Sequence, residues 1–597
     1  MPAPRLRSVV QILLALFAAT GFIGLVAEQV YQKLLGTLVG ASTPAAATVL
    51  AAYFGGLTLG SAGYDRWLRR RVGNPILAYA VLEGGVAALL VVTVLLFDRL
   101  LILFAPFLAL ARHSEAGLLI ARLIVAAVWV VPPTFLMGAS LPAIADSIAM
   151  LRLPSRHRLV ALFYTINLVG AIVGSVAAPY IVFPMLGLDG ALTICAALGA
   201  VVALTAQRLA RSYSVERWQL RESPATVSME SSRGARSVIL LLAFSSGFIF
   251  FALETLWVHL LAAVIGNSVY AFATMLTVVL IGLGIGSGIS VLILPPAQTT
   301  SWTFLGGVLF SSGLALTVTH GLWPTIPHSL ALVGRDITSF GAGEFLRFRH
   351  ALAVVLLPAA LLGIWFPTLF RLPDFPKQRL GDFVGKTYAA NAMGCVIGAL
   401  GTSFLLLPRF GSDTLLSVFA ALLIVSGALL AVWRRRAVWP VAVAASLAGL
   451  VILNLPSWDR LRLTSGEHVY FSENAVRPDS QLLYFREDAA GGITTVVAST
   501  DVVNGRPYVL RTLLTNGKFQ GNDGGEKTAQ ASFGMIPGLM TRDFNDVLVI
   551  GAGTGATADI VHTLGFKNVR IAEIAPPIID AARREFSGLN HHIFDQP

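Results

Sequence analysis

The chain contains very little cysteine and little charge for its length. Only two cysteines occur in 597 residues, and both, Cys195 and Cys395, lie within long apolar runs. Two isolated thiols in apolar helices provide neither a disulfide framework nor the ligand spacing of a metal site, so we expect no metal. Charged residues make up 13% of the sequence, which excludes an ordinary soluble globular protein.

The chain is rich in apolar residues. They form 55% of the chain, and the mean hydropathy is +0.74. Many apolar stretches run for about 20 residues, the length at which a helix spans a lipid bilayer. From residue 456 onward the polarity is ordinary. The sequence therefore predicts a polytopic helical membrane part followed by a soluble domain.

The apolar runs fall into two groups of six predicted membrane helices. The first group covers 9–35, 43–64, 76–97, 118–138, 159–183 and 187–208, and the second covers 237–261, 268–294, 302–320, 348–370, 383–407 and 413–433. A further apolar run covers 437–455, whereas runs near 100–111 and 321–333 are too short to span and are expected at the interface. The polar segment 209–236 is predicted to link the two groups.

The two groups repeat each other at an offset near 225 residues. The matching pairs are Glu28 and Glu254, Gly60 and Gly286, Tyr164 and Tyr388, and Asn167 and Asn391. Chance apolar composition does not produce a sustained offset of polar and glycine residues. Because each group holds an even number of spans, the repeats are expected to run parallel in the membrane, which resembles the arrangement in the major facilitator superfamily.

The net charge of +11 comes mostly from arginines in short loops between the apolar runs. Membrane orientation and anionic lipid explain such a pattern better than nucleic acid does, so we expect the bilayer as a partner and no nucleic acid. The arginine-rich loops fall on the side of the N-terminus, which is therefore predicted to be cytoplasmic. If 437–455 spans, the soluble domain lies outside the cell; if that run is interfacial, the domain is cytoplasmic.

Two acids lie at matching places inside predicted membrane helices, Glu28 and Glu254. A carboxylate in the membrane is costly, so it is usually paired, protonated or part of a pathway. Both are predicted to face the bundle interior. There they would either form a proton or cation site or make a hydrogen bond between helices. Glu83 and Arg122 suggest an intramembrane ion pair. The repeated asparagines are expected to pack helices closely rather than to bind substrate.

The polar C-terminal part contains a strand, a glycine-rich turn, a helix, a second strand and an acid in that order. The apolar run 547–550 suits a buried parallel strand, and the turn follows at once with Gly551, Gly553 and Gly555. Such glycines let a nucleotide approach the unpaired N–H groups of a helix N-terminus. Glu573 ends the second strand and suits the ribose hydroxyls of that nucleotide. The alternatives are a glycine-rich turn of another α/β unit and a solvated acid.

Residues 546–586 resemble the nucleotide-binding core of spermidine synthases, the aminopropyltransferases that use decarboxylated S-adenosylmethionine. The segment 513–520 and Glu526 resemble the preceding hairpin of that family. The whole chain is similar to bacterial proteins in which a transporter-like bundle is fused to such a domain, which implies a multi-pass protein of the bacterial inner membrane. The resemblance also implies an S-adenosyl-type cofactor and a polyamine or other small-molecule substrate. The cofactor would lie at Gly551, Gly553, Gly555 and Glu573, and the substrate near Gln520, Glu526 and Thr554.

The chain also departs from the pattern of that family. Thr554 stands where the family has an acid between its loop glycines, and Ala529 and Gln530 stand where it has a Tyr-His pair. These changes remove groups that hold a cationic amine and help to deprotonate it. The resemblance places the family's catalytic Asp beyond Pro597, so we expect either a truncated sequence or a remnant domain, and the catalytic residue is unknown. Whether the chain is an active enzyme is left open.

The expected fold class is a polytopic α-helical membrane protein of two six-helix repeats, major-facilitator-like, plus an incomplete C-terminal α/β domain of Rossmann-like, methyltransferase type. The expected divisions are repeats at 1–208 and 237–433, a linker at 209–236, an extra helix at 434–455, a β-rich part at 456–545 and a nucleotide-binding half at 546–597. The leading expectation is an aminopropyltransferase homologue that binds an S-adenosyl nucleotide but transfers little polyamine. The alternatives are a secondary transporter with a regulatory or cargo-processing soluble domain, and a non-enzymatic scaffold. The sequence does not set the oligomeric state.

Overall fold

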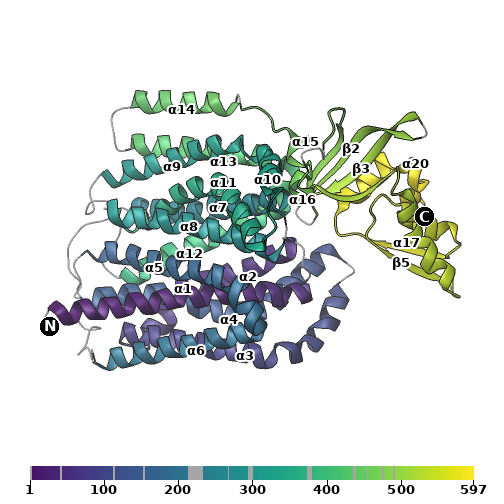
Figure 1. The fold of residues 1–597 in the computed structure, drawn as a ribbon. Helices are drawn as coiled ribbons and strands as arrows, with labels where there is room; N and C mark the ends of the chain where they lie inside the picture. Colours follow the sequence, from purple (N-terminus) through teal and green to yellow (C-terminus); the bar gives the residue numbers. More distant parts are fainter. Residues whose placement is uncertain are drawn as a thin grey trace.

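A computed structural model describes residues 3–39, 43–111, 114–151, 155–212, 233–266, 268–293, 300–372, 380–433, 438–453, 455–472, 476–488, 491–503 and 505–596. Its long helices pack side by side as a bundle, and a smaller part with two sheets lies at one end of the bundle (Figure 1). In these ranges, nine helical stretches are long and apolar enough to cross a membrane. The predicted multi-pass helical protein is therefore confirmed at this coarse level.

In the described residues, the first half of the bundle contains six long helices. They are α1 (Ala3–Val39), α2 (Thr43–Tyr64), α3 (Pro75–Leu110), α4 (Glu115–Met150), α5 (Arg156–Ala177) and α6 (Phe183–Ser212). The run near 100–111, which was expected at the interface, is not a helix of its own, because it forms the last turns of α3. The charged residues Asp98 and Arg99 are exposed, so they do not end the helix.

The part of the second half that the structure describes also contains six long helices. They are α7 (Arg233–Val264), α8 (Val269–Ile293), α9 (Thr300–His320), α11 (Phe340–Leu369), α12 (Leu380–Gly401) and α13 (Leu407–Trp433). Two short helices, η5 (Trp323–Thr325) and α10 (Ile326–Gly334), form the run near 321–333. Most of the expected linker, 213–232, lies outside the described residues.

The same helix contact occurs once in each half. The Asn167 side chain on α5 donates a hydrogen bond to the carbonyl of Phe17 on α1 at 3.1 Å. The Asn391 side chain on α12 donates to the carbonyl of Ala243 on α7 at 3.2 Å. A partly buried amide that binds a neighbouring backbone fixes the relative depth of two helices, which fits the packing role expected for these asparagines.

The last helix of each half is interrupted near its start. Gly187 in α6 and Gly411 in α13 have φ values of 68° and 73°, a region that glycine adopts without strain. A π-helical turn precedes each break, η3 (Ala178–Val182) before α6 and η6 (Thr402–Leu406) before α13. Each glycine therefore separates a short entry segment from the straight part of its helix.

The chain crosses the bundle once more before it enters the sheets. α13 begins beside the sheet part, where Ser412 contacts Glu487, and ends at Trp433. α14 (Val438–Leu453) packs along α13 and leads back, so that Trp458 contacts Asp413 near the start of α13. The N-terminus and the sheet part therefore lie at opposite ends of the bundle (Figure 1).

A buried ionic cluster ties the two halves together at the end far from the sheets. Arg69 lies on the π-helical turn η1 (Asp65–Arg69) and contacts Asp65 at 2.8 Å and Asp146 of α4 at 3.0 Å. Asp146 also accepts the N–H of Gly381, at the start of α12, at 3.0 Å. A carboxylate is favourable there because the first N–H groups of a helix have no partner within it.

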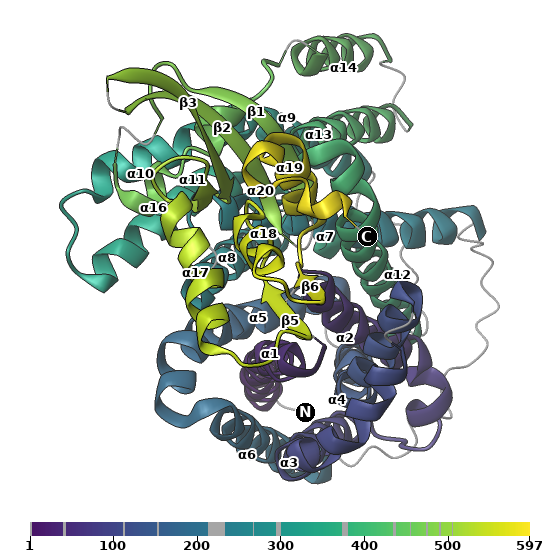
Figure 2. The same cartoon turned by 90° about the vertical axis from the view of Figure 1, so that its right-hand side faces the viewer.

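The C-terminal part contains two sheets (Figure 2). An antiparallel sheet has the order β1 (Gln481–Asp488), β2 (Gly492–Val503), β3 (Arg506–Thr515) and β4 (Lys518–Asn522), and a parallel pair consists of β5 (Asp546–Ile550) and β6 (Asn568–Ala572). The helices are α15 (Arg460–Leu463), α16 (Glu467–Tyr470), α17 (Lys527–Met540), α18 (Ala556–Thr563), α19 (Pro576–Glu585), α20 (Ser587–Asn590) and η7 (Ile593–Asp595). Pro597 lies outside the described residues.

β5 differs from the fully buried strand that the sequence suggested. Val549 is buried against α18, whereas Leu548 and Ile550 are 57% and 83% exposed. Successive side chains of a strand point to opposite faces, so a strand is buried on both faces only where both are covered. In the described part of the chain, β5 is covered mainly on the face of Val549.

Candidate functional site

A cavity of about 210 Å³ lies between the two halves of the bundle. Its walls come from α1, α2, α4 and α5 of the first half and from α7, α8, α11 and α12 of the second. Matching positions of the two halves supply much of the polar lining, namely Glu28 and Glu254, Tyr164 and Tyr388, and Asn167 and Asn391. The structure therefore brings all four membrane-site candidates from the sequence to one place.

The two acids face this cavity from α1 and α7. Glu28 is buried and accepts a weak hydrogen bond from Gln32 Nε2, one helical turn further along, at 3.4 Å. Glu254 is partly buried and lies near enough to Glu28 to interact with it electrostatically. Two carboxylates in an apolar surrounding repel each other, so this arrangement favours a proton or another cation between them.

The remainder of the lining is aromatic and neutral. The Tyr53 hydroxyl donates to the carbonyl of Gly24 at 3.1 Å, and the ring of Tyr164 lies against Phe366 with centroids 5.2 Å apart. Among the described residues that line the cavity there is no lysine, arginine or histidine. Aromatic faces and carboxylates both attract positive charge, so the chemistry of the cavity suits a cation.

Glu83 has a different partner from the one proposed for it. Its carboxylate accepts a hydrogen bond from Ser140 Oγ of α4 at 2.9 Å. Glu83 is 1% exposed, whereas Arg122, which also lies on α4, is only partly buried. The suggested Glu83–Arg122 ion pair is therefore not the contact that α3 and α4 make, because the helices present Ser140 to the acid.

The glycine-rich turn connects β5 to α18, and β6 follows. Gly551, Gly553 and Gly555 all have positive φ, at 88°, 52° and 87°. A side-chain carbon at Gly555 would lie 2.7 Å from the Phe594 ring and 2.9 Å from Asn590. The turn therefore needs glycine for its backbone conformation at all three positions and for space at the last.

Glu573 holds this turn in place. Its Oε2 accepts the N–H of Ala552 at 2.8 Å, and its Oε1 accepts those of Ile574 and Ala575 at 2.8 and 2.9 Å. A carboxylate offers about four acceptor positions, so one remains on Oε2 for a ligand hydroxyl. The acid proposed for ribose thus also fixes the backbone that a nucleotide would approach.

The residues proposed to bind substrate are only partly brought together. Thr554 is 1% exposed and donates a short hydrogen bond to the side-chain oxygen of Gln530. Gln530 in turn donates to the carbonyl of Asn522 at 3.1 Å. Gln520 on β4 and Glu526 at the start of α17 are exposed. Thr554 and Gln530 therefore form a neutral, internally bonded pair where the resembled family has charged or proton-accepting groups.

The catalytic residue stays unassigned in this domain. Two acids of the C-terminal helices already have partners, since Asp559 contacts His591 at 2.8 Å and Asp595 contacts Arg583 at 2.8 Å. These contacts stabilise the end of the domain and give neither acid the role of a catalytic base.

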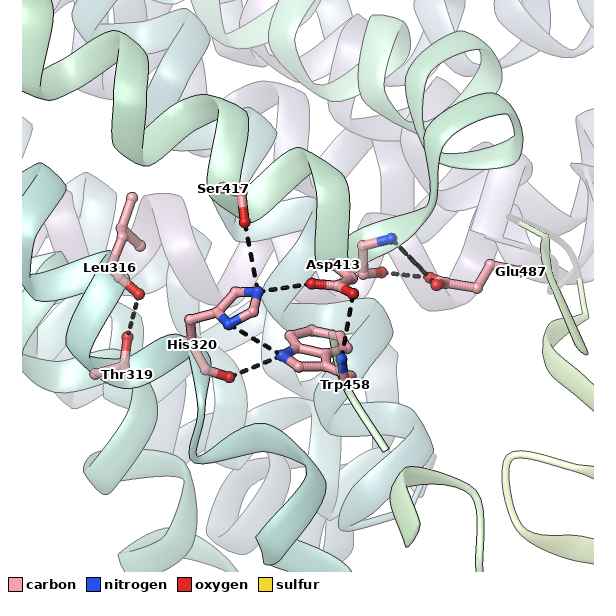
Figure 3. Close-up of polar contacts among 8 residues, drawn as sticks. Leu316, Thr319, His320, Asp413, Ser417, Trp458 and Glu487 are labelled. Atoms are coloured by element: carbon pink, nitrogen blue, oxygen red, sulfur yellow. Dashed lines mark hydrogen bonds and ion pairs between the residues drawn. The ribbon is translucent and has the colours of Figure 1, made fainter. Parts of the chain in front are cut away.

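A second polar cluster, which the sequence did not reveal, joins β1 to the second half (Figure 3). Glu487 is 9% exposed and accepts hydrogen bonds from the backbone N–H of Ser412 at 3.1 Å and from Ser412 Oγ at 2.5 Å. It also contacts His259 Nε2 of α7 at 3.2 Å. Burial alone would raise the pKa of Glu487, but the hydrogen bonds and charge of His259 and the donors of Ser412 outweigh burial and lower it. Glu487 is therefore ionised at neutral pH.

A histidine and a tryptophan extend this cluster. His320 Nε2 lies 2.7 Å from Asp413 Oδ1, and the Trp458 indole N–H donates to the carbonyl of His320 at 2.9 Å (Figure 3). The partners are 93 and 138 positions apart in the chain. Such distant pairs leave no periodic signal, and the only local hint is the sequence Gly-Ser-Asp at 411–413, directly before an apolar run.

No known family model matches the chain. The polyamine aminopropyltransferase 1 of Streptomyces coelicolor is 26% identical over 381 residues, which cover 61% of this chain. The match spans 65% of the length of that relative. The chain is thus similar to an enzyme named for polyamine chemistry over part of the length of each protein.

The chain is also similar to solved structures of transporters. The fucose:proton symporter of E. coli is 15% identical, with a TM-score of 0.39, and the match covers 70% of this chain and 98% of that chain. The human organic anion transporter TETRAN is 14% identical, with a TM-score of 0.38 and coverage of 72% and 100%. A bacterial homologue of the human lysosomal transporter Spinster is 17% identical, with a TM-score of 0.39 and coverage of 77% and 100%.

Structural likenesses at these TM-scores carry no argument about the function of this chain. The predicted resemblance is nevertheless confirmed as a similarity by the aminopropyltransferase match together with the membrane-capable helices. The chain joins a multi-pass helical part to a sheet-containing part, and it is similar to a polyamine aminopropyltransferase.

Proposed function

We propose that this protein moves a small organic cation of the amine class across the bacterial inner membrane. The observation that carries the proposal is the position of Glu28 and Glu254, which come from matching places in the two halves and face one cavity. Membrane carboxylates are costly unless they are used, and acids that face a polar cavity commonly mark an ion or proton pathway.

Two repeats that each have an even number of membrane spans are compatible with transport by alternating access. The shared asparagine contacts, the paired glycine breaks and the offset near 225 support two structural repeats related by an axis along the membrane normal. In such transporters the binding site lies between the repeats, which rock about it. The cavity lies at that place, so a solute in it could be exposed to each side in turn.

The amine class follows from charge and size. The described lining contains two acids and no basic side chain, so an anion would pay a large desolvation cost without a partner. A volume of about 210 Å³ is below the usual range of drug-sized sites and suits a slender molecule. Because the chain is similar to a polyamine aminopropyltransferase, short polyamines are the first solutes to test.

Cys395 provides a direct test because it lines the cavity and is one of only two cysteines. In a Cys195→Ser background, putrescine is expected to slow maleimide labelling of Cys395, by about tenfold at ten times its dissociation constant. Butanediol, which has the same length without the charges, is expected to leave the rate unchanged. Proteoliposomes that contain the same Cys195→Ser protein should accumulate labelled putrescine.

Glu254→Gln and Glu28→Gln complete this test. Each replacement keeps the size of the side chain and removes its charge, so protection by putrescine and uptake should both be lost. Equal protection by putrescine and butanediol, or full protection that persists in both variants, would contradict an amine site in the cavity.

A second function, binding of an S-adenosyl-type nucleotide, is favoured by the turn between β5 and α18. Its three glycines keep the turn before α18 free of side chains, so that an anion could approach the N-terminus of this helix, and Glu573 retains one acceptor position at the same turn. This domain would then sense or hold a nucleotide while the bundle transports. The neutral pair Thr554 and Gln530 argues against polyamine transfer as its main task.

We also propose an orientation, with the N-terminus in the cytoplasm and the sheet part on the outer face. The arginine-rich loops gather at the N-terminal end, and α14 brings the chain to the other end. In a protein without its two native cysteines, Lys527→Cys on α17 is expected to react with an impermeant maleimide added to intact cells. Arg66→Cys on η1 should react only after lysis. The reverse pattern would place the sheet part in the cytoplasm, where S-adenosyl nucleotides are made, and would favour the second function.

A further inference from the structure

The straight part of α13 begins at Ser412, directly after the break at Gly411. The first N–H groups of a helix have no partner within that helix and carry a partial positive charge. Ser412 is completely buried, so water cannot satisfy its N–H. This start of a helix therefore needs an acceptor from another part of the molecule.

Glu487 supplies that acceptor from the sheet part. Both of its carboxylate oxygens lie 3.1 Å from the Ser412 nitrogen, and the Ser412 hydroxyl also donates to it. A side-chain carbon at position 411 would lie 3.1 Å from the carboxylate, so Gly411 makes room for Glu487 as well as allowing the break. Glu487 acts as an N-cap provided by a distant strand.

The same carboxylate also reaches α7 through His259, at 3.2 Å. His259 follows Glu254 by five positions, which corresponds to about 7.5 Å along a helix. Trp458 and Asp413 make the adjoining contact with His320 at the end of α9. The cluster thus joins the ends of α7, α9 and α13 that lie beside the sheet part to that part. One of these helices, α7, also carries the cavity acid Glu254.

The first half has the same break without this cap. Gly187 and Asp189 occupy the places of Gly411 and Asp413, and both are exposed. A side-chain carbon at Gly187 would meet no atom of the described chain within 4 Å. The sheet part packs against the bundle mainly through α16 with α10, β1 with α13, α15 with η5, and β2 with α7, and all of these bundle elements belong to the second half.

We propose that Glu487 is a clamp through which the sheet part controls opening of the cavity. With the clamp closed, the outer ends of α7 and α13 are fixed to each other and the sheet part moves as one body with the second half. Release of Glu487 leaves the start of α13 uncapped and frees α7 to move. This inference rests on one part of the proposed function, namely that the two halves move relative to each other about the cavity. It does not depend on which solute the cavity binds.

Two measurements on the full-length Cys195→Ser protein test the clamp. In Glu487→Gln, hydrogen exchange of the amides at 412–415 and maleimide labelling of Cys395 are both expected to rise about tenfold, since a charged N-cap and its bonds are lost. Ser412→Ala removes only the hydroxyl donor and should change both rates in the same direction by less. If Glu487→Gln folds poorly, the clamp can still be tested with this milder variant.

Matched controls separate the clamp from a general loss of charge. Asp189→Asn changes the corresponding turn of the first half, and Glu585→Gln removes an acid at the end of α19 in the sheet part, so neither should alter either rate. Faster exchange at 412–415 with unchanged labelling of Cys395 would overturn control of the cavity, as would equal effects in the controls. If putrescine fails to protect Cys395 while Glu487→Gln still speeds its labelling, the proposed function fails and the clamp stands.

Discussion

Replacement of Gly286 by alanine is expected to destabilise the bundle by about 3 kcal/mol or more, at the upper end of the cost of overpacking. A side-chain carbon at Gly286 in α8 would lie 1.9 Å from the carbonyl oxygen of Ala360 and 2.8 Å from the backbone of Gly363, both in α11. Backbone atoms of a packed helix cannot turn away as a flexible side chain can, so the two helices must separate.

Gly288 provides a matched control on the same helix. A side-chain carbon there would meet nothing within 4 Å among the described residues. Gly288→Ala should therefore leave stability equal or slightly higher, because alanine favours a helix over glycine by up to about 1 kcal/mol. Thermal unfolding can be followed by the reaction of the two buried cysteines with a thiol-reactive dye.

The corresponding residue in the first half extends this prediction. At Gly60 a side-chain carbon would lie 1.8 Å from the carbonyl oxygen of Phe135. If the halves are repeats, Gly60→Ala should lower the unfolding temperature by a similar amount to Gly286→Ala. Similar unfolding temperatures for Gly286→Ala and Gly288→Ala would show that α8 and α11 do not pack this closely.

The second large effect is expected in aminopropyl transfer. Purified protein mixed with putrescine and decarboxylated S-adenosylmethionine is expected to release methylthioadenosine at a rate close to background. Thr554 and Gln530 bond to each other and supply no charge to hold an amine or to take its proton. A positioned general base alone contributes about 10²–10⁴-fold to rate. An active spermidine synthase under the same conditions is the positive control.

The same preparation separates binding from turnover. If the turn between β5 and α18 holds a nucleotide, binding should be measurable by calorimetry and should be lost in Glu573→Ala, which removes the acceptor for three backbone N–H groups. Glu585→Ala, at the end of α19, is a control acid in the same region. Turnover on the order of 1 per second, an ordinary enzyme rate, would contradict the transfer prediction.

The sequence predicted most of the features that depend on neighbouring residues. The long apolar runs gave the membrane-capable helices, and the order of β5, the glycine turn, α18 and β6 followed from residues 546–573 alone. The acids Glu28 and Glu254 could be recognised from the sequence because a charged residue is rare within an apolar run of helical length. These patterns are local, since a helix or a strand–turn–helix unit is specified by residues within a few turns of one another.

Other features were decided by contacts between distant parts of the chain. The extension of α3 to Leu110, the choice of Ser140 as the partner of Glu83, and the exposure of Leu548 and Ile550 depend on which neighbours cover a face. The path of α14 back along α13 follows from the contact of Trp458 with Asp413, whereas the side of the membrane that carries the sheet part stays a prediction.

The sequence by itself therefore determined the class of the protein, its membrane acids and its glycine turn. Only the tertiary structure placed Glu28 and Glu254 in one cavity and set Glu487 against Ser412 and His259. The physical reason is that a hydropathy pattern records how each residue meets water or lipid, whereas a hydrogen bond between residues 75 or 228 positions apart is fixed by the packing of whole helices and strands.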